Sequence, residues 1–138
     1  MASPSISVFF PCYNDEKTIG KLVKDSITTL EKLTNNYEVI VVNDGSSDGS
    51  LALLRKLQKK HPVLKVVNHR KNKGYGGALI SGFKKSSKKL VFYTDGDGQY
   101  DVKELPILLK LMTPDVDFIN GIKIDRKSTR LNSSHLVI

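Results

Sequence analysis

Residues 5–42 read SISVFFPCYNDEKTIGKLVKDSITTLEKLTNNYEVIVV, and this stretch contains two apolar runs separated by a polar loop and an amphipathic segment. The runs 5–10 and 37–42 are rich in β-branched and aromatic residues, which predicts buried strands. Between them, apolar residues recur at helical spacing from Glu16 to about Thr34, and Asn14 or Asp15 can cap that helix. The stretch is therefore a strand–helix–strand unit, the building block of a parallel sheet.

The same alternation continues along the rest of the chain. Further strands are predicted at 64–67, 90–94 and 117–122, and further helices at 48–60, 78–85 and 102–112. A chain of 138 residues is long enough for one domain with a substantial core. We therefore expect an α/β fold, a Rossmann-like three-layer sandwich with a mainly parallel sheet covered by helices on both faces.

The composition excludes several classes of protein. With 39% hydrophobic and 26% charged residues, the chain is typical of a globular domain. No apolar run approaches the roughly 20 residues of a membrane span, and the N-terminus has no secretion signal, so we expect a cytoplasmic location.

The Cys and His residues indicate neither a metal site nor nucleophilic catalysis. Cys12 is the only cysteine, which excludes a disulfide framework and a cysteine-based zinc site. His61, His69 and His135 are too scattered to indicate a metal cluster. His61 and His69 flank the third predicted strand, far from any obvious nucleophile, so no Ser–His–Asp arrangement is expected.

The charge is strongly uneven. The net charge is +8, and the segment from Arg55 to Lys89 contains twelve Lys or Arg and no acidic residue. Such a block is typical of a solvated face, and it also suits a phosphate-rich ligand, an anionic membrane surface or a nucleic acid.

Four polar clusters directly follow predicted strands. They are PCYNDE at 11–16, NDGSSDGS at 43–50, HRKNKGYGG at 69–77 and TDGDGQYD at 94–101. In an open α/β sheet, ligands bind in the crevice outside the carboxyl ends of the strands. We therefore expect all four loops to share one rim.

The acidic cluster allows more than one interpretation. As a calcium hand starting at Asp95, it would have Tyr100 at the obligatory Gly position and Pro106 at the bidentate Glu position, so that motif is excluded. A solvated turn remains possible. So does a Mg²⁺ or Mn²⁺ site in which one of Asp95 and Asp97 faces the metal while the other reaches a ribose or a metal-bound water, and Gly96 leaves room for a phosphate ligand.

Other phosphate-binding templates are absent from the sequence. It has no G-x-x-x-x-G-K-[ST] motif, which excludes a P-loop. The dinucleotide fingerprint belongs after the first strand, where residues 11–16 contain no glycine, so a nicotinamide cofactor is not expected.

Taken in order, SVFFPCYNDEKTI, EVIVVNDGSSDGS, NHRKNKGYGGALISGF and VFYTDGDGQYD resemble the family 2 glycosyltransferases of GT-A fold. The likeness is greatest to the branch with dolichol-phosphate mannose synthase and bacterial polyprenyl-phosphate glycosyltransferases. It runs from about Ser5 to Gly121, which implies the nucleotide-sugar-binding half of a C-terminally truncated GT-A domain at residues 1–124. Residues 125–138 resemble translated adapter sequence, so we expect a non-native tail there.

The resemblance implies roles for residues in each loop. Asp44 would hydrogen-bond the base, although a capping role would also suit it. Asp97 would be a direct metal ligand, Asp95 would contact the ribose or the metal, and Asp101 is left as a helix cap. The full set of implied nucleotide-sugar and metal contacts is Pro11, Tyr13, Asn14, Glu16, Val42, Asp44, Asn72, Gly74, Asp95, Gly96, Asp97 and Gln99.

The family implies an inverting, metal-dependent glycosyltransferase that uses Mg²⁺ or Mn²⁺. Its donor would be a UDP- or GDP-sugar, its acceptor a dolichyl or undecaprenyl phosphate, and it would bind no nucleic acid. The full-length parent would lie at the cytoplasmic membrane face, and this fragment would lack the acceptor site. The alternatives are a nucleotidyltransferase, or a non-enzymatic module that binds RNA or anionic lipid through residues 55–89.

Overall fold

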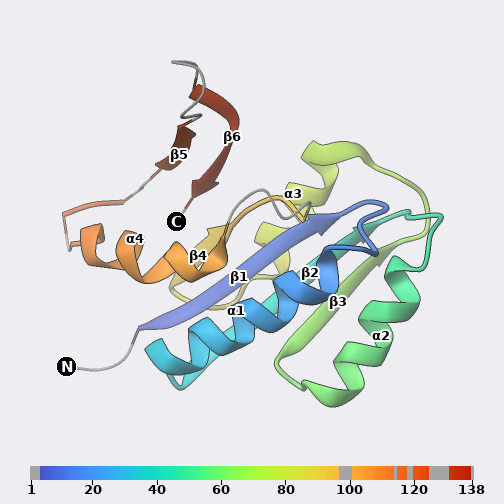
Figure 1. Cartoon of the computed structure of the whole chain (residues 1–138), viewed down its shortest axis with the longest axis horizontal. Coiled ribbons are helices and arrows are strands. Elements are labelled where there is room, and N and C mark those ends of the chain that lie inside the picture. Colours follow the sequence, from blue (N-terminus) through green and yellow to red (C-terminus); the bar gives the residue numbers. More distant parts are fainter. Residues whose placement is uncertain (1–3, 97–100, 114, 118–119, 125–130, 138) are drawn as a thin grey trace.

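The chain alternates strands and helices from its first described residues. The computed structural model describes residues 4–96, 101–113 and 115–117, and the backbone of residues 120–124 and 131–137. The elements in chain order are β1 (Ser5–Cys12), α1 (Ile19–Leu33), β2 (Asn36–Asp44), α2 (Ser50–Lys60), β3 (Leu64–His69), α3 (Gly74–Lys85), β4 (Leu90–Tyr93), a 3₁₀ turn (Val102–Glu104), α4 (Leu105–Leu111), β5 (Asn120–Ile124) and β6 (Leu131–Val137) (Figure 1).

The strands form one six-stranded sheet in the order β3-β2-β1-β4-β6-β5. β1 lies at its centre and pairs in parallel with β2 and β4, so that Val8 has Val39 on one side and Phe92 on the other. β2 pairs in parallel with β3, and β6 pairs antiparallel with β4 and β5. The predicted α/β fold with a mainly parallel sheet is confirmed.

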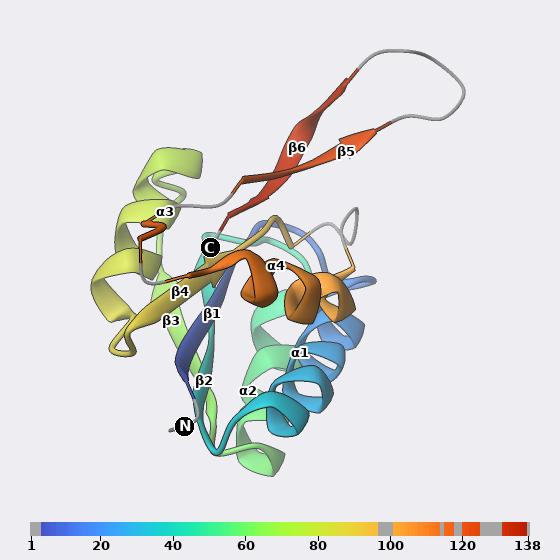
Figure 2. The same cartoon turned by 90° about the vertical axis from the view of Figure 1, so that its left-hand side faces the viewer.

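Helices cover both faces of the parallel strands, as a three-layer sandwich requires. Figure 2 shows α1, α2 and α4 on one side of the sheet and α3 on the other. Alternate residues of β1 point to opposite faces of the sheet. Val8 and Phe10 pack on the face covered by α1 and α2. Phe9 packs on the face covered by α3, with Ile40 and Ala78. All of these side chains are buried, which explains why the strand sequences are almost continuously apolar.

Several element boundaries differ from the predicted ones. α1 begins at Ile19 rather than at Glu16, because the Asp15 carbonyl accepts the N–H groups of Thr18 and Ile19 in a preceding turn. α2 begins at Ser50, and β2 and β3 continue to Asp44 and His69. The side chains of Asp44 and His69 therefore project from the ends of strands rather than from loops.

The largest change concerns α3, which begins at Gly74 and so includes the glycines assigned to a loop. Glycine disfavours a helix by about 1 kcal/mol relative to alanine, which is why the sequence indicated a loop. The backbone N–H of Gly74 donates to the Asn72 side chain at 2.9 Å, and Ala78 and Gly82 are buried against the sheet. These tertiary contacts outweigh the low helix propensity.

The C-terminal elements also depart from the prediction. The expected helix 102–112 is a 3₁₀ turn followed by α4, and the expected strand 117–122 is β5 at Asn120–Ile124. No element was predicted at 131–137, where β6 lies. Pairing of β6 uses backbone groups, so it needs no alternation of apolar side chains. Among the described residues, no helix is both long and apolar enough to cross a bilayer.

Candidate functional site

A pocket of about 380 Å³ opens at the carboxyl ends of β1, β2 and β4, beside the N-terminal turn of α3. The chain builds outward from β1 through β2 to β3 and then returns to place β4 on the other side of β1. This reversal of strand order leaves a crevice, the usual ligand position in open α/β sheets. The residues that line the pocket are Pro11, Cys12, Tyr13, Asp15, Asp44, Asn72, Gly74, Tyr75, Ala78, Asp95 and Gly96.

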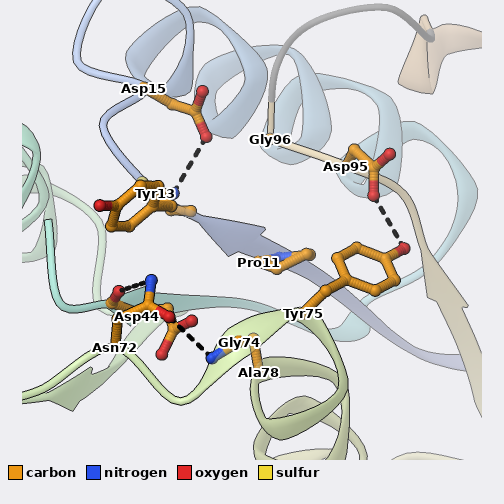
Figure 3. Close-up of a pocket in the computed structure, with 11 residues that line it drawn as sticks. Pro11, Tyr13, Asp15, Asp44, Asn72, Gly74, Tyr75, Ala78, Asp95 and Gly96 are labelled. Atoms are coloured by element: carbon orange, nitrogen blue, oxygen red, sulfur yellow. Dashed lines mark hydrogen bonds between the residues drawn. The ribbon is translucent and has the colours of Figure 1, made fainter.

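Asp44 lines the pocket, and its side chain is only 5% exposed. Its Oδ1 accepts the backbone N–H of Lys73 at 2.8 Å and lies 2.8 Å from Nδ1 of His69. The Asn72 side chain donates to the Asp44 carbonyl at 3.1 Å (Figure 3). The end of β2 is therefore tied to the loop that precedes α3, and the carboxylate is held in one orientation.

His69 connects Asp44 to Ser81, because its Nε2 lies 2.8 Å from the Ser81 hydroxyl. His69 was predicted to lie far from any nucleophile, with no Ser–His–Asp arrangement, whereas the structure places a serine hydroxyl and a carboxylate at its two ring nitrogens. The register of β2 with β3 sets Asp44 directly opposite His69. A pairing register between two strands is not visible in local sequence patterns, which is why the contact was missed.

The β1–α1 loop divides its side chains between the pocket and a neighbouring loop. Tyr13 lines the pocket with 52% of its surface exposed, and its N–H donates to the Asp15 carboxylate at 3.1 Å. Asn14 has a φ of 53°, a left-handed conformation that Asn tolerates better than most residues. Asn14 does not belong to the pocket lining.

Asn14 and Glu16 instead anchor the β2–α2 loop. Asn14 Oδ1 accepts the N–H groups of Ser47 at 2.8 Å and Asp48 at 3.3 Å. Glu16 Oε2 accepts the N–H of Gly49 at 3.1 Å. Neither residue belongs to the pocket lining, so their predicted nucleotide contacts gain no geometric support.

Val42, also predicted to contact the nucleotide, is fully buried beneath α3 and does not line the pocket. By contrast, Asp15 and Tyr75 line it and were not predicted as site residues. Asp15 was assigned only a capping role, and Tyr75 belonged to the polar cluster 69–77 with no role of its own. The start of α3 at Gly74 brings Tyr75 to the pocket.

The acidic turn after β4 forms the opposite wall. Asp95 Oδ1 accepts the Tyr75 hydroxyl at 2.9 Å, which links β4 to α3 across the pocket (Figure 3). The Gly96 carbonyl accepts the Thr18 hydroxyl at 2.9 Å, which holds the turn against α1. Asp97 and Gln99, two further predicted contacts, lie outside the described residues. Asp101 accepts the N–H of Lys103 at 2.9 Å, which confirms its role as a helix cap.

The carboxylates suit a hard divalent cation that shares its ligands with a phosphate. Asp15 and Asp95 line the same pocket, although the described residues contain no group of three or more Asp, Glu, His or Cys placed to hold a metal. Mg²⁺ and Mn²⁺ sites of phosphate-handling enzymes commonly use only one or two protein carboxylates, with phosphate and water as the remaining ligands. The residues present fit that kind of site.

Cys12 also lines the pocket, but its thiol is largely unreactive near neutral pH. Burial raises the pKa of the thiol to about 11, although a hydrogen bond with Ser50 opposes the rise. Since the thiolate is the reactive form, Cys12 has no role as a nucleophile near neutral pH.

The basic block from Arg55 to Lys89 does not form one surface. Its twelve basic residues are divided among α2, β3, the β3–α3 loop, α3 and the segment before β4, and α2 and α3 cover opposite faces of the sheet (Figure 2). Lys65 is paired with buried Glu38 at 2.6 Å. Lys84 and Lys85 lie in the last turn of α3, where they complement the helix dipole. This distribution argues against a single RNA- or lipid-binding face.

Comparison with known proteins identifies the family. The profile of Glycosyl transferase family 2 matches residues 7–136. The chain belongs to glycosyl transferase family 2. Its four ordered motifs and its GT-A fold agree with that assignment, and the predicted resemblance is confirmed.

Several family 2 relatives share the matched region. The chain is 32% identical over 136 residues to an undecaprenyl-phosphate 4-deoxy-4-formamido-L-arabinose transferase of Edwardsiella ictaluri, covering 96% of this chain and 42% of that protein. The chain thus spans about two fifths of the length of such curated relatives.

Two solved structures are similar to the fold described here. A mannosyltransferase from Pyrobaculum calidifontis in complex with GDP-Man and Mn²⁺ has a TM-score of 0.74 and 27% identity, covering 87% of this chain and 36% of that one. S. aureus TarS 1–349 in complex with UDP-GlcNAc has a TM-score of 0.64 and 30% identity, covering 78% of this chain and 30% of that one.

Proposed function

We propose that this chain is the nucleotide-sugar-binding part of a metal-dependent, inverting family 2 glycosyltransferase. The observation that carries the proposal is the convergence of Asp44, Asn72, Tyr13 and Asp95 on one pocket at the point where the strand order reverses. The donor would be a UDP- or GDP-sugar, because similar structures were solved with GDP-Man and with UDP-GlcNAc.

The pocket offers a different chemical group to each part of such a donor. Asp44 presents a carboxylate suited to accept an N–H from a base, and the exposed ring of Tyr13 offers a flat surface on which a base can stack. On the opposite wall, Asp95 presents a carboxylate for a ribose hydroxyl or a divalent ion. The donor would therefore lie across the pocket, with its base near β2 and its phosphates near β4.

A divalent cation, Mg²⁺ or Mn²⁺, would be held by Asp95 and by Asp97, which follows it in the acidic turn. Bound there, such an ion supplies charge neutralisation for the departing nucleoside diphosphate. A Mn²⁺ ion is present in the similar mannosyltransferase structure, which supports a divalent metal in this family.

The acceptor would be a polyprenyl phosphate at the cytoplasmic face of a membrane. Relatives with about 30% identity are transferases named for undecaprenyl phosphate. A phosphate oxygen is already an anionic nucleophile, so the acceptor requires no general base from the protein. We place the nucleotide-binding part at residues 1–124 and expect the acceptor site to lie outside this chain.

Calorimetric titration tests the proposal. UDP and GDP are titrated into the chain with and without Mn²⁺, and into the variants Asp95→Asn and Asp97→Ala. We expect metal-dependent binding that falls at least tenfold in Asp97→Ala, since a charged ligand is lost. The control Asp25→Asn changes a partly exposed carboxylate on α1 that, among the described residues, pairs with Lys21, and it should bind like the parent. Tight RNA binding without metal-dependent nucleotide binding would favour the basic module instead.

A transfer assay tests the acceptor part separately. With a radiolabelled sugar donor and polyprenyl phosphate, we expect little or no product from these 138 residues. Robust turnover by the chain alone would contradict the expectation that the acceptor site lies elsewhere.

A further inference from the structure

A buried hydrogen-bonded chain runs from α3 through β3 to the pocket. The Ser81 hydroxyl lies 2.8 Å from His69 Nε2, and His69 Nδ1 lies 2.8 Å from Asp44 Oδ1. His69 is 6% exposed and Asp44 is 4% exposed, so water competes little for these contacts. The contacts run in the order Ser–His–Asp, as in the catalytic triad of a hydrolase, but here the Asp rather than the Ser lies at the pocket.

A nucleophilic role for Ser81 is inconsistent with its position. Of the three residues, only Asp44 lines the described pocket, and the pocket lining includes neither His69 nor Ser81. Ser81 lies in the third turn of α3, and its hydroxyl contacts His69 at the end of β3. A substrate in the pocket would meet the acidic end of the chain, and the serine lies at the far end.

The contacts determine where the protons lie. An ionised carboxylate only accepts hydrogen bonds, so His69 Nδ1 must carry the hydrogen shared with Asp44. In the neutral ring Nε2 then accepts the Ser81 hydroxyl, and Ser81 fixes both the tautomer and the orientation of the ring. Asp44 Oδ1 therefore receives two N–H donors, one from His69 and one from the backbone of Lys73.

This arrangement leaves the second carboxylate oxygen for a ligand. Within the described residues, Asp44 Oδ2 takes part in none of the hydrogen bonds, and Asp44 lines the pocket. A carboxylate oxygen in that place selects a ligand with an N–H to donate. Uracil and guanine carry a hydrogen on the ring nitrogen of their pairing edge, whereas cytosine and adenine carry a lone pair there.

We propose that His69, oriented by Ser81, is a positioning residue for nucleobase recognition: it holds Asp44 Oδ1 so that Oδ2 accepts the ring N–H of uracil or guanine and disfavours cytosine and adenine. The proposal rests on the nucleotide-sugar function proposed above. It adds His69 and Ser81 to the specificity apparatus, although neither would touch the ligand.

The test compares ligands that have a base with one that has none. UDP, GDP, CDP and inorganic pyrophosphate are titrated by calorimetry in the presence of Mn²⁺ into the parent chain, His69→Phe, His69→Asn and Ser81→Ala. The midpoint of thermal unfolding is measured for each. Phe keeps the bulk of the ring without its N–H, whereas the Asn amide can replace the Nδ1 donor.

We expect the parent to prefer UDP or GDP over CDP by at least tenfold. His69→Phe should lose about tenfold in affinity for the preferred nucleotide, the effect of one charge-assisted hydrogen bond, with CDP and pyrophosphate unchanged. His69→Asn should recover most of the loss, and Ser81→Ala should lose about threefold. If His69→Phe does not fold, the comparison of Ser81→Ala with the parent decides the question.

Two outcomes overturn the positioning role while leaving the proposed function intact. In one, the parent binds UDP or GDP and the His69 and Ser81 variants keep its base preference. In the other, the variants weaken pyrophosphate binding by the same factor, which would indicate a merely structural contact. A parent chain that binds pyrophosphate but no nucleotide, or binds none of the ligands, would overturn the proposed function and the positioning role together.

Discussion

Replacement of Glu38 by Gln should remove a large part of the stability of this chain, with a characteristic dependence on pH. Glu38 lies on β2 and is 2% exposed, with its carboxylate accepting hydrogen bonds from Lys65 at 2.6 Å, Ser7 at 2.6 Å and the N–H of Ser87 at 2.7 Å. Burial alone would raise the pKa of Glu38, but these donors outweigh it and lower the pKa from 4.5 to about 2.

The magnitude follows from that change in pKa. A fall from 4.5 to about 2 corresponds to about 3 kcal/mol of preferential stabilisation of the charged form in the folded chain. Because the folded pKa lies below the unfolded one, this stabilisation is complete above about pH 5 and is lost as the pH falls toward 2. Glu38→Gln should therefore be about 3 kcal/mol less stable at pH 7, and the difference should shrink toward zero near pH 2.

The assay is urea unfolding of the parent and of Glu38→Gln at a series of pH values from 7 to 2.5, with the free energy of unfolding compared at each. Taking the difference between the two proteins cancels the titration of the other carboxylates. Glu31→Gln, an exposed position on α1, is the matched control and should change stability by no more than about 0.5 kcal/mol. A difference between parent and Glu38→Gln that stays constant from pH 7 to pH 3 would refute the reasoning.

Three further substitutions or treatments test other parts of the fold. Gly82→Ala should destabilise by about 1–3 kcal/mol in thermal unfolding, because its Cβ would lie 2.2 Å from the buried ring of Phe9, whereas Gly76→Ala on the same helix meets no atom and should be neutral or stabilising by up to about 1 kcal/mol. Asn14→Ala should lower the unfolding free energy by about 1–2 kcal/mol in urea denaturation, since two backbone N–H groups lose their acceptor and the φ of 53° becomes strained. Cys12 should not react with a thiol reagent at pH 8 in the native chain and should react fully in denaturant; rapid native reaction would contradict its burial and a pKa of about 11.

The fold was predictable because each of its signals is local. The apolar runs of β1 and β2 and the periodic segment between them specify one strand–helix–strand unit, and repetition of that unit specifies a parallel sheet. Parallel strands bring their carboxyl ends to one edge, so the prediction that polar loops gather on one rim followed without coordinates. Asp44, Asn72 and Asp95 were assigned to that rim from their sequence positions and do line one pocket.

The boundaries that were missed depend on contacts between distant residues. The start of α3 at Gly74 relies on Ala78 and Gly82 packing against the sheet, which overrides the low helix propensity of its glycines. β6 depends on pairing with β4 and β5 rather than on its own sequence. In both cases the stabilising partner is far away in the chain.

The sequence by itself determined the family, the alternation of strands and helices and the edge of the sheet where the site lies. Only the tertiary structure decided which side chains point into that site. Asn14 and Glu16 turn toward the β2–α2 loop, Tyr75 turns to meet Asp95, and the register of β2 with β3 sets Asp44 against His69. The physical reason is that a side chain's direction and partners depend on backbone conformation and strand register, which local patterns of residue type do not specify.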